Sequence, residues 1–133
     1  ELVLIVSNEH PLAKNESVDL TEVASYPFIG FSEKSGIRSI IQDLFKEVNI
    51  VPNTICEVEE DNAVAGLVEI NYGIAVVPRI SSLKYYNVKV LPIINPEHER
   101  FIYLATLKNR YLTPVVNLFK KYSLEYSKKL LNK

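Results

Sequence analysis

The chain has 133 residues, 47% of them hydrophobic and 23% charged, a composition typical of one globular domain and not of a disordered or fibrous chain. Lys and Arg number 15 against 16 Asp and Glu, so the net charge of −1 argues against nucleic-acid binding by this chain alone. The single Cys excludes an internal disulfide, and no apolar run approaches the roughly 20 residues that cross a bilayer.

The first predicted element is a strand over residues 2–6, an apolar run rich in β-branched side chains. Its continuous apolar character favours burial on both faces, which requires neighbouring strands on both sides. Pro11 ends this region because proline lacks an N–H group. Asp19 is expected to cap a short helix over residues 20–25, and residues 27–31 then predict a second strand.

The chain up to residue 78 continues to alternate between the two kinds of element. We predict strands at 54–58 and 74–77 and helices at 36–48 and 62–71. Ser32 or Ser35 is expected to cap the first helix, and Asp61 or Asn62 the second. This alternation predicts that the strands from residue 27 onward run parallel in one sheet, with the helices covering its faces.

The remainder of the chain has a different pattern. Residues 88–93 and 101–107 predict two strands joined by a polar stretch. Thr113-Pro114 then predicts the start of a long amphipathic helix, because proline is favoured at the first helical position. A boundary near residues 78–87 is expected.

The strongest site candidate from the residues is the segment from Ser32 to Arg38, where a strand end meets a helix start. Ligands of open α/β sheets bind at the carboxyl ends of strands, and free N–H groups at a helix start attract anions. An ordinary capped loop is the alternative. The acidic residues from Glu57 to Asp61 indicate either solvated charge at a helix start or, more weakly, a cation site.

The sequence indicates no catalytic centre. His10 and His98 are expected at the surface, and Cys56 is expected to be a small core residue. No pair of a nucleophile and a base and no phosphate-binding glycine-rich loop is present, and two His with one Cys cannot form a common structural zinc site. We therefore expect a protein that is not an enzyme and has no cofactor.

Several stretches together resemble LysR-type transcriptional regulators. They are Leu2–Ser7 with Glu9–Ala13 (the family's strand and "HPLA" turn), Pro27–Phe31 with Ser35–Arg38 ("PFI…SG.R"), and Glu57–Glu59 with Leu67-Val68 and Gly73–Pro78 ("E.E…LV..G.GIA.VP"). Phe101–Leu104 and the closing helix resemble the family's C-terminal end. The resemblance covers nearly the whole chain, and the order and spacing of the stretches make it specific.

The resemblance implies an α/β fold like that of type 2 periplasmic binding proteins, in which two α/β subdomains are joined by crossover strands. Residues 1–133 would be one effector-binding domain fragment. Residues 7–78 would form the second regulatory subdomain, and residues 79–133 would return to the first, truncated at its N-terminal side. The absent Met and the abrupt apolar start predict a piece of a longer chain.

The resemblance also implies the function: a non-enzymatic domain that senses a small molecule for a bacterial, cytoplasmic transcription regulator. The implied effector-binding residues are Ser7, Gly30, Phe31, Ser32, Ser35, Gly36, Glu57 and Pro78. The effector would be a small organic anion or, if Glu57 binds an ammonium group, an amino acid, and the fragment alone would bind it weakly.

The resemblance further implies a homo-oligomer, with a dimer favoured, that contacts DNA only through a missing N-terminal winged helix-turn-helix. A solute-binding protein of a transporter, which has the same fold, is the alternative function.

Overall fold

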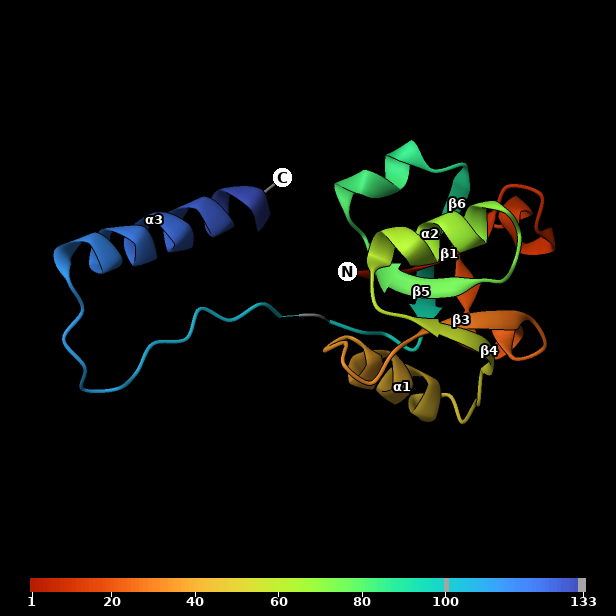
Figure 1. Ribbon diagram of the computed structural model, residues 1–133, viewed down its shortest axis with the longest axis horizontal. Coiled ribbons are helices and arrows are strands. Elements are labelled where there is room, and N and C mark those ends of the chain that lie inside the picture. The colour runs from red at the N-terminus through yellow and green to blue at the C-terminus, as the bar shows by residue number, and fades with distance from the viewer. Residues whose placement is uncertain (100, 132–133) are drawn as a thin grey trace. The chain divides into compact units, whose positions relative to one another are not determined.

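The computed structural model describes residues 1–99 and 101–131 (Figure 1). The strands are β1 (Leu2–Ser7), β2 (Val18–Asp19), β3 (Pro27–Phe31), β4 (Asn53–Val58), β5 (Ala75–Pro78) and β6 (Val88–Asn95). The helices are α1 (Arg38–Glu47), α2 (Asp61–Glu69) and α3 (Pro114–Leu131), with short 3-10 turns at Pro11–Lys14, Leu20–Val23 and Ser81–Tyr85. The chain divides into two compact units, residues 1–100 and 101–133.

The first unit is built around β1, whose six residues are all buried. This strand is the centre of a four-stranded sheet with the order β2-β6-β1-β5. It runs antiparallel to both β5 and β6, while β2 runs parallel to β6. The predicted strand with neighbours on both sides is therefore confirmed, and these neighbours come from distant parts of the chain.

The parallel part of the fold differs from the prediction of one sheet. β3 and β4 form a two-stranded parallel sheet, but β5 forms its ladder with β1. A single parallel bridge between Phe28 and Ile74 joins β3 to β5. It consists of two backbone hydrogen bonds of 2.8 Å, from Ile29 N to Ile74 O and from Ile74 N to Pro27 O. The predicted common direction of the three strands is confirmed, but their membership of one sheet is wrong.

Gly73 explains how β5 reaches β3. A side chain at Gly73 would place its Cβ 2.8 Å from the carbonyl oxygen of Pro27 and 3.1 Å from Cγ1 of Ile29. Real Cβ atoms essentially never approach another heavy atom within 3.0 Å, so only glycine permits this spacing. The junction of the two sheets therefore depends on the missing side chain.

The two helices of this unit pack on different strands. α2 contacts β1, β5 and β6, and α1 contacts β3 through an edge-to-face pair of Phe28 and Phe45 with ring centroids 5.2 Å apart (Figure 1). The side-chain caps predicted for α1 and α2 are wrong: Ile37 and Glu60 occupy the two N-cap positions, and neither makes a side-chain capping bond. The predicted Asp19 cap is confirmed, since its side chain accepts from Thr21 N at the start of the 3-10 turn Leu20–Val23.

The ends of α1 and α2 are built alike. Each is closed by a left-handed Asn, Asn49 or Asn71, whose φ is 55° or 59°. In each case the following N–H group, that of Ile50 or Tyr72, bonds back to a carbonyl of the last helical turn.

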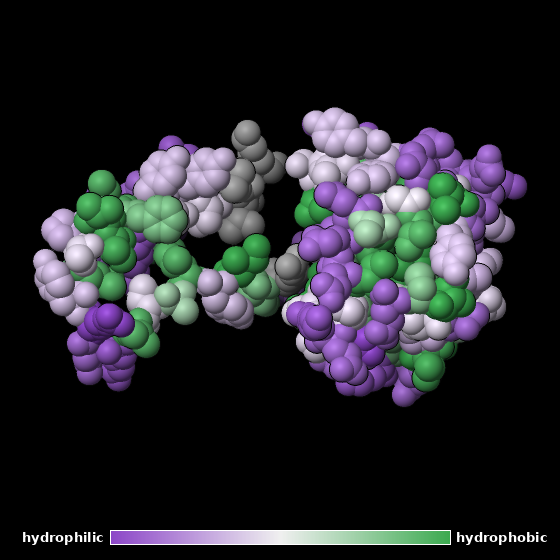
Figure 2. Space-filling model, viewed as in Figure 1, coloured by the Kyte–Doolittle hydropathy of each residue, from purple (hydrophilic) through white to green (hydrophobic). Residues whose placement is uncertain are grey.

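The second unit is an extended segment followed by α3. Residues 101–107, predicted as a strand, form none, because no other segment pairs with them among the described residues. The predicted helix is confirmed, and its apolar side chains are exposed, as the space-filling view shows (Figure 2). None of the helices in the described part of the chain has the length and apolar character needed to cross a membrane.

Candidate functional site

The candidate site follows from the directions of the strands. β2, β6, β5, β3 and β4 all point the same way, and β1 points the opposite way. The carboxyl ends of β2, β3, β4, β5 and β6 and the start of β1 therefore lie along one edge, which we call the strand-end edge. Open α/β sheets bind ligands at such an edge.

A short loop, residues 32–37, connects β3 to α1 at this edge. Its backbone is ordered by bonds from Ser32 N to Val58 O (3.0 Å) and from Ser35 N to Ser32 O (3.0 Å). The hydroxyl oxygen of Ser32 is buried and has no hydrogen-bond partner among the described residues. Gly36 borders open space, because an added Cβ would meet nothing within 4 Å. The loop therefore holds a buried hydroxyl without a partner among the described residues and has open space beside Gly36.

Arg38, the first residue of α1, reaches back across this loop. Its guanidinium donates to the carbonyl oxygen of Phe31 at 3.0 Å and pairs with the Glu57 carboxylate at 2.7 Å. The hydrogen bond to Glu57 is the main cause that raises the pKa of Arg38 above its usual value. Glu57 is thus already neutralised by a cation from its own fold.

A groove of about 360 Å³ runs between α1 and the β3–β4 sheet. The β3–β4 ladder is irregular after Phe28, so that Thr54 pairs with Phe28 and Glu57 pairs with Gly30. The side chains of Thr54 and Glu57 therefore both face the groove. A Cβ at Gly30 would lie 3.2 Å from the Thr54 methyl group and 3.8 Å from the Glu57 side chain, so glycine leaves room between these two side chains. The groove is therefore apolar along Phe28 and Phe45 and polar where Arg38 meets Glu57.

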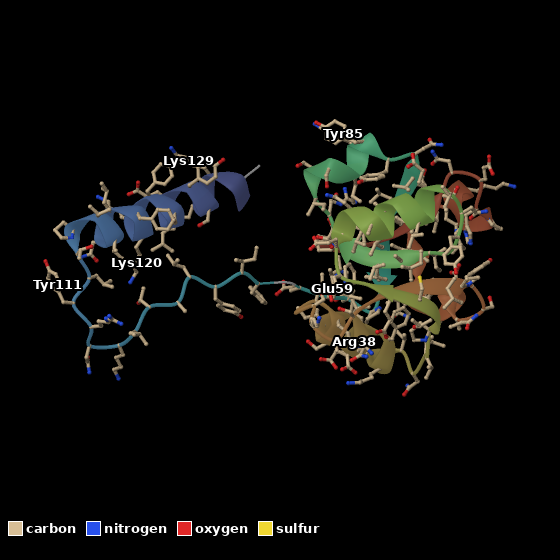
Figure 3. All side chains as sticks on the ribbon, in the orientation of Figure 1. Arg38, Glu59, Tyr85, Tyr111, Lys120 and Lys129 are labelled. Atoms are coloured by element: carbon tan, nitrogen blue, oxygen red, sulfur yellow. The ribbon has the colours of Figure 1, made fainter. Side chains whose placement is uncertain are left out.

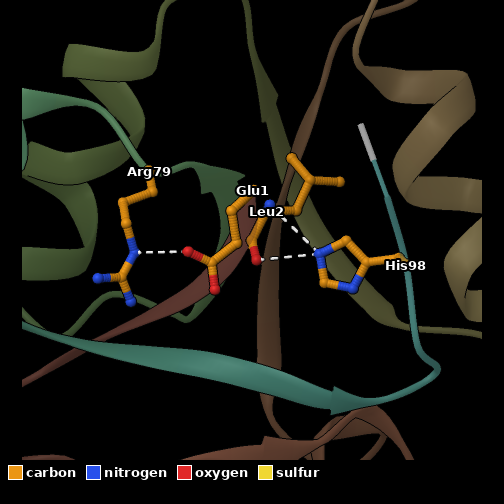
Figure 4. A network of polar contacts seen from close by, with 4 residues as sticks. All are labelled: Glu1, Leu2, Arg79 and His98. Atoms are coloured by element: carbon orange, nitrogen blue, oxygen red, sulfur yellow. Dashed lines mark hydrogen bonds and ion pairs between the residues drawn. The ribbon is translucent and has the colours of Figure 1, made fainter. Parts of the chain in front are cut away.

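The segments that follow β5 and β6 meet the start of β1 at the same edge. Arg79, just after β5, pairs with the Glu1 carboxylate at 3.0 Å, and the backbone N–H group of Arg79 donates to the Glu1 carbonyl oxygen at 3.0 Å. The His98 Nε2 atom lies 3.3 Å from the Leu2 nitrogen and 3.2 Å from the Leu2 oxygen (Figure 4). Both segments are thereby fixed to the start of β1.

The structure gathers most of the predicted effector-binding residues around the end of β3. Gly30, Phe31 and Glu57 line the groove, and Ser32, Ser35 and Gly36 belong to or border the loop. Pro78 ends β5 at the strand-end edge, opposite Leu2. Ser7 lies at the other end of β1, roughly 17 Å from Leu2 at about 3.3 Å per residue, and is not brought to this edge.

The acidic residues from Glu57 to Asp61 and the side chain of His10 have other surroundings than a metal site and an exposed surface, respectively. Two members of the acidic run form ion pairs, since Glu57 pairs with Arg38 and Glu59 with Lys34 at 3.5 Å. Figure 3 labels Arg38 on α1 and Glu59, which follows β4. No group of metal-binding side chains occurs among residues 1–99 and 101–131. His10 is buried rather than exposed, its Nδ1 accepts from Leu12 N at 3.2 Å, and burial lowers its pKa.

Sequence reasoning missed Arg38, Arg79 and His98 as residues that organise this edge. Arg38 ends one of the recognised motifs, but its contact with Glu57 spans a helix and a strand. Arg79 and His98 contact Glu1 and Leu2 at the far end of the chain. Sequence carries no local signal for such pairs.

Comparisons with known proteins agree with this geometry. The family model described as "LysR substrate binding domain" matches residues 1–128. An uncharacterised HTH-type transcriptional regulator of Bacillus subtilis, YybE, is 36% identical over 126 residues, which cover 95% of this chain and 43% of that relative. The chain thus spans less than half of the relative's length.

Solved structures resemble the chain as well. The effector-binding domain of QuiR in complex with shikimate has a TM-score of 0.90 and 54% identity, covering 97% of this chain and 62% of that one. The BenM effector-binding domain with its effector benzoate has a TM-score of 0.63 and 25% identity, covering 73% of this chain and 46% of that one.

Proposed function

We propose that this chain, which belongs to the LysR substrate-binding domain family, senses a small hydroxylated carboxylate of the shikimate class. The whole protein would be a transcription regulator that acts in the cytoplasm and contacts DNA through a separate segment. The observation that carries the ligand class is the 54% identity to a domain whose complex holds shikimate.

The charges at the site favour a simple anion over an amino acid. An amino acid would need a carboxylate free to bind its ammonium group, and Glu57 is the candidate for that role. The Glu57 carboxylate lies 2.7 Å from the Arg38 guanidinium, and breaking this pair would expose two charges. Benzoate, the effector of the BenM neighbour, is likewise a carboxylate without an amine.

We place the effector's carboxylate at the loop of residues 32–37. The Ser32 hydroxyl has no partner among the described residues, and the backbone N–H groups at the start of α1 favour negative charge. Phe31, Ser35, Gly36 and Pro78 would border the same ligand. Ser7 is left out of this proposed site, because a small molecule at the loop cannot reach the opposite end of β1.

The relatives favour a regulator over the solute-binding alternative. The Bacillus subtilis relative is described as a transcriptional regulator, and the QuiR and BenM structures are described as effector-binding domains. None of these descriptions names a transport receptor. A receptor for a transporter has no support of this kind. The absence of a catalytic pair in the sequence is consistent with a sensor.

The test is a titration of the ¹⁵N-labelled chain with shikimate, followed by amide chemical shifts, which detects even millimolar binding. Shikimate should shift the amides of residues 31–37 and 79, and cyclohexanecarboxylate, which lacks the hydroxyls, should bind more weakly. Glycine at the same concentration tests the amino-acid alternative. No shifts with shikimate, or shifts confined to α2, would exclude the proposed site.

We further propose that the chain self-associates through β4 and α1. Among the described residues β4 pairs only with β3, so its outer edge carries unpaired backbone groups. Apolar side chains beside it are exposed, with Val51 at 88% and Ile55 at 41%. Sedimentation velocity should give a dimer for the wild type and a monomer for Ile55→Lys. A single-chain mass for the wild type at high micromolar concentration would refute this.

A further inference from the structure

The start of α1 is held by an unusual arrangement for a helix N-terminus. Ile37 occupies the N-cap position and makes no side-chain bond to the first turn. The side chain of the next residue, Arg38, instead reaches the end of β3 at Phe31 and the end of β4 at Glu57. The two ends of the loop of residues 32–37 are thus linked by one guanidinium group.

This link differs from the other ion pairs nearby. The Arg38 side chain is only 24% exposed, and it makes a second bond to a backbone carbonyl. The Lys46–Asp43 pair, on the same helix at 2.8 Å, has side chains that are 74% and 64% exposed. Partly buried, charge-assisted bonds hold their geometry better than solvated surface pairs do.

From this geometry we infer that Arg38 is a positioning residue that passes effector occupancy of the loop to α1. The inference rests on the proposed function, because it requires a ligand at residues 32–37. A ligand bonded to the Ser32 hydroxyl moves the backbone beside Phe31, whose carbonyl oxygen is one of the two anchors of Arg38. Since α1 begins at Arg38, the helix follows the loop. Arg38 also borders the cavity beside residues 33–36, so its effect on affinity has to be measured separately from its effect on α1.

The experiment separates ligand affinity from the response of α1. Five forms of the chain are compared: wild type, Arg38→Gln, Arg38→Lys, Glu57→Gln and the control Lys46→Gln. Shikimate affinity is taken from amide shifts in the loop, and the response of α1 from hydrogen exchange of residues 39–47. Lys46→Gln removes an ion pair of similar length on the same helix and should change neither quantity.

In the wild type, shikimate should alter exchange in α1 at least threefold. In Arg38→Gln, measured at shikimate concentrations that saturate the loop amides, the α1 response should disappear, and Arg38→Lys, which keeps the charge, should restore part of it. Glu57→Gln removes the partner of Arg38 and should reduce the α1 response at the same loop occupancy. A purely structural role would leave the response per bound ligand unchanged, so a full α1 response in Arg38→Gln at full loop occupancy overturns the inference.

A second measurement does not need the effector. Ser32→Ala changes the loop, and its effect on the amide shifts of residues 42–47 can be compared with and without Arg38→Gln. The inference requires these shifts to appear only when Arg38 is present. If shikimate fails to bind but this coupling is found, the proposed ligand is wrong and the role of Arg38 stands. If the coupling is absent, the inference is wrong.

Discussion

Replacing Gly73 with alanine should separate the two sheets of the first unit. The new Cβ would lie 2.8 Å from the Pro27 carbonyl oxygen, against 3.4–4 Å for ordinary contact. That oxygen accepts the 2.8 Å bond from Ile74 N, so it cannot retreat without weakening the junction. Overpacking costs about 1–3 kcal/mol and a lost hydrogen bond about 1 kcal/mol, so we expect a loss of about 2–4 kcal/mol.

The matched control is Gly66→Ala in the interior of α2. An added Cβ there meets nothing within 4 Å, and alanine is favoured over glycine in a helix by about 0.5–1 kcal/mol. Urea unfolding followed by circular dichroism should therefore give opposite signs for the two glycine variants. A Gly73→Ala midpoint at or above that of the wild type would refute the claim that this close approach joins β5 to β3.

Three further outcomes follow from single side chains. Ser32→Ala should leave thermal stability unchanged or raise it by up to about 1 kcal/mol, since the hydroxyl is buried and no described residue bonds to it. The same change should weaken shikimate binding in the amide titration, and a clear loss of stability contradicts this. Gly36→Ala should fold normally but weaken shikimate binding at least threefold, because its Cβ enters the open space beside the loop; unchanged affinity argues against a ligand there. Because burial lowers the pKa of His10 in the folded state, protons favour the unfolded chain below its ordinary pKa of about 6.5. Urea unfolding should therefore show stability falling from pH 7 to pH 5, and less steeply in His10→Asn; equal slopes would remove His10 as the cause.

Much of the secondary structure of the first unit is predictable because it follows from local patterns. The apolar run over β1 predicts a buried strand, and the helical spacing between Ile37 and Val48 predicts α1. The helix ends are less predictable. Asn49 and Asn71 can adopt left-handed conformations, and this freedom, rather than a glycine, closes both helices.

The strand partners could not be predicted in this way. β5 has the same direction as β3, but its ladder forms with β1, and α2 packs across both β1 and β5. Residues 101–107 have a strand-like pattern and no partner among the described residues, so the pattern alone produces no strand. A strand pattern specifies a half-buried surface and leaves the identity of the neighbour open.

The candidate site was predictable where its residues are consecutive and not where they come together through folding. The loop from Ser32 to Gly36 follows from one strand end and one helix start. The partner of Glu57 does not follow from the sequence, because a carboxylate beside a strand end can bind either a cationic ligand or a neighbouring cationic side chain. Only the approach of Arg38 to 2.7 Å decides between the two, and with it the expected charge of the effector.

The strand-end edge has little hydrogen-bonding capacity left to offer. Ser32 N is bonded to Val58 O, Arg79 N to Glu1 O, and the Leu2 backbone meets His98. The principal cations at this edge, Arg38 and Arg79, already hold Glu57 and Glu1. A ligand that needed many polar contacts would have to break these bonds, whereas the proposed small anion would need only the N–H groups at the start of α1 and, after a shift of the loop, the buried Ser32 hydroxyl. The position of α1 should also respond to the loop, because a displacement of the loop at Phe31 acts on the hydrogen bond that Arg38 donates to the Phe31 carbonyl oxygen.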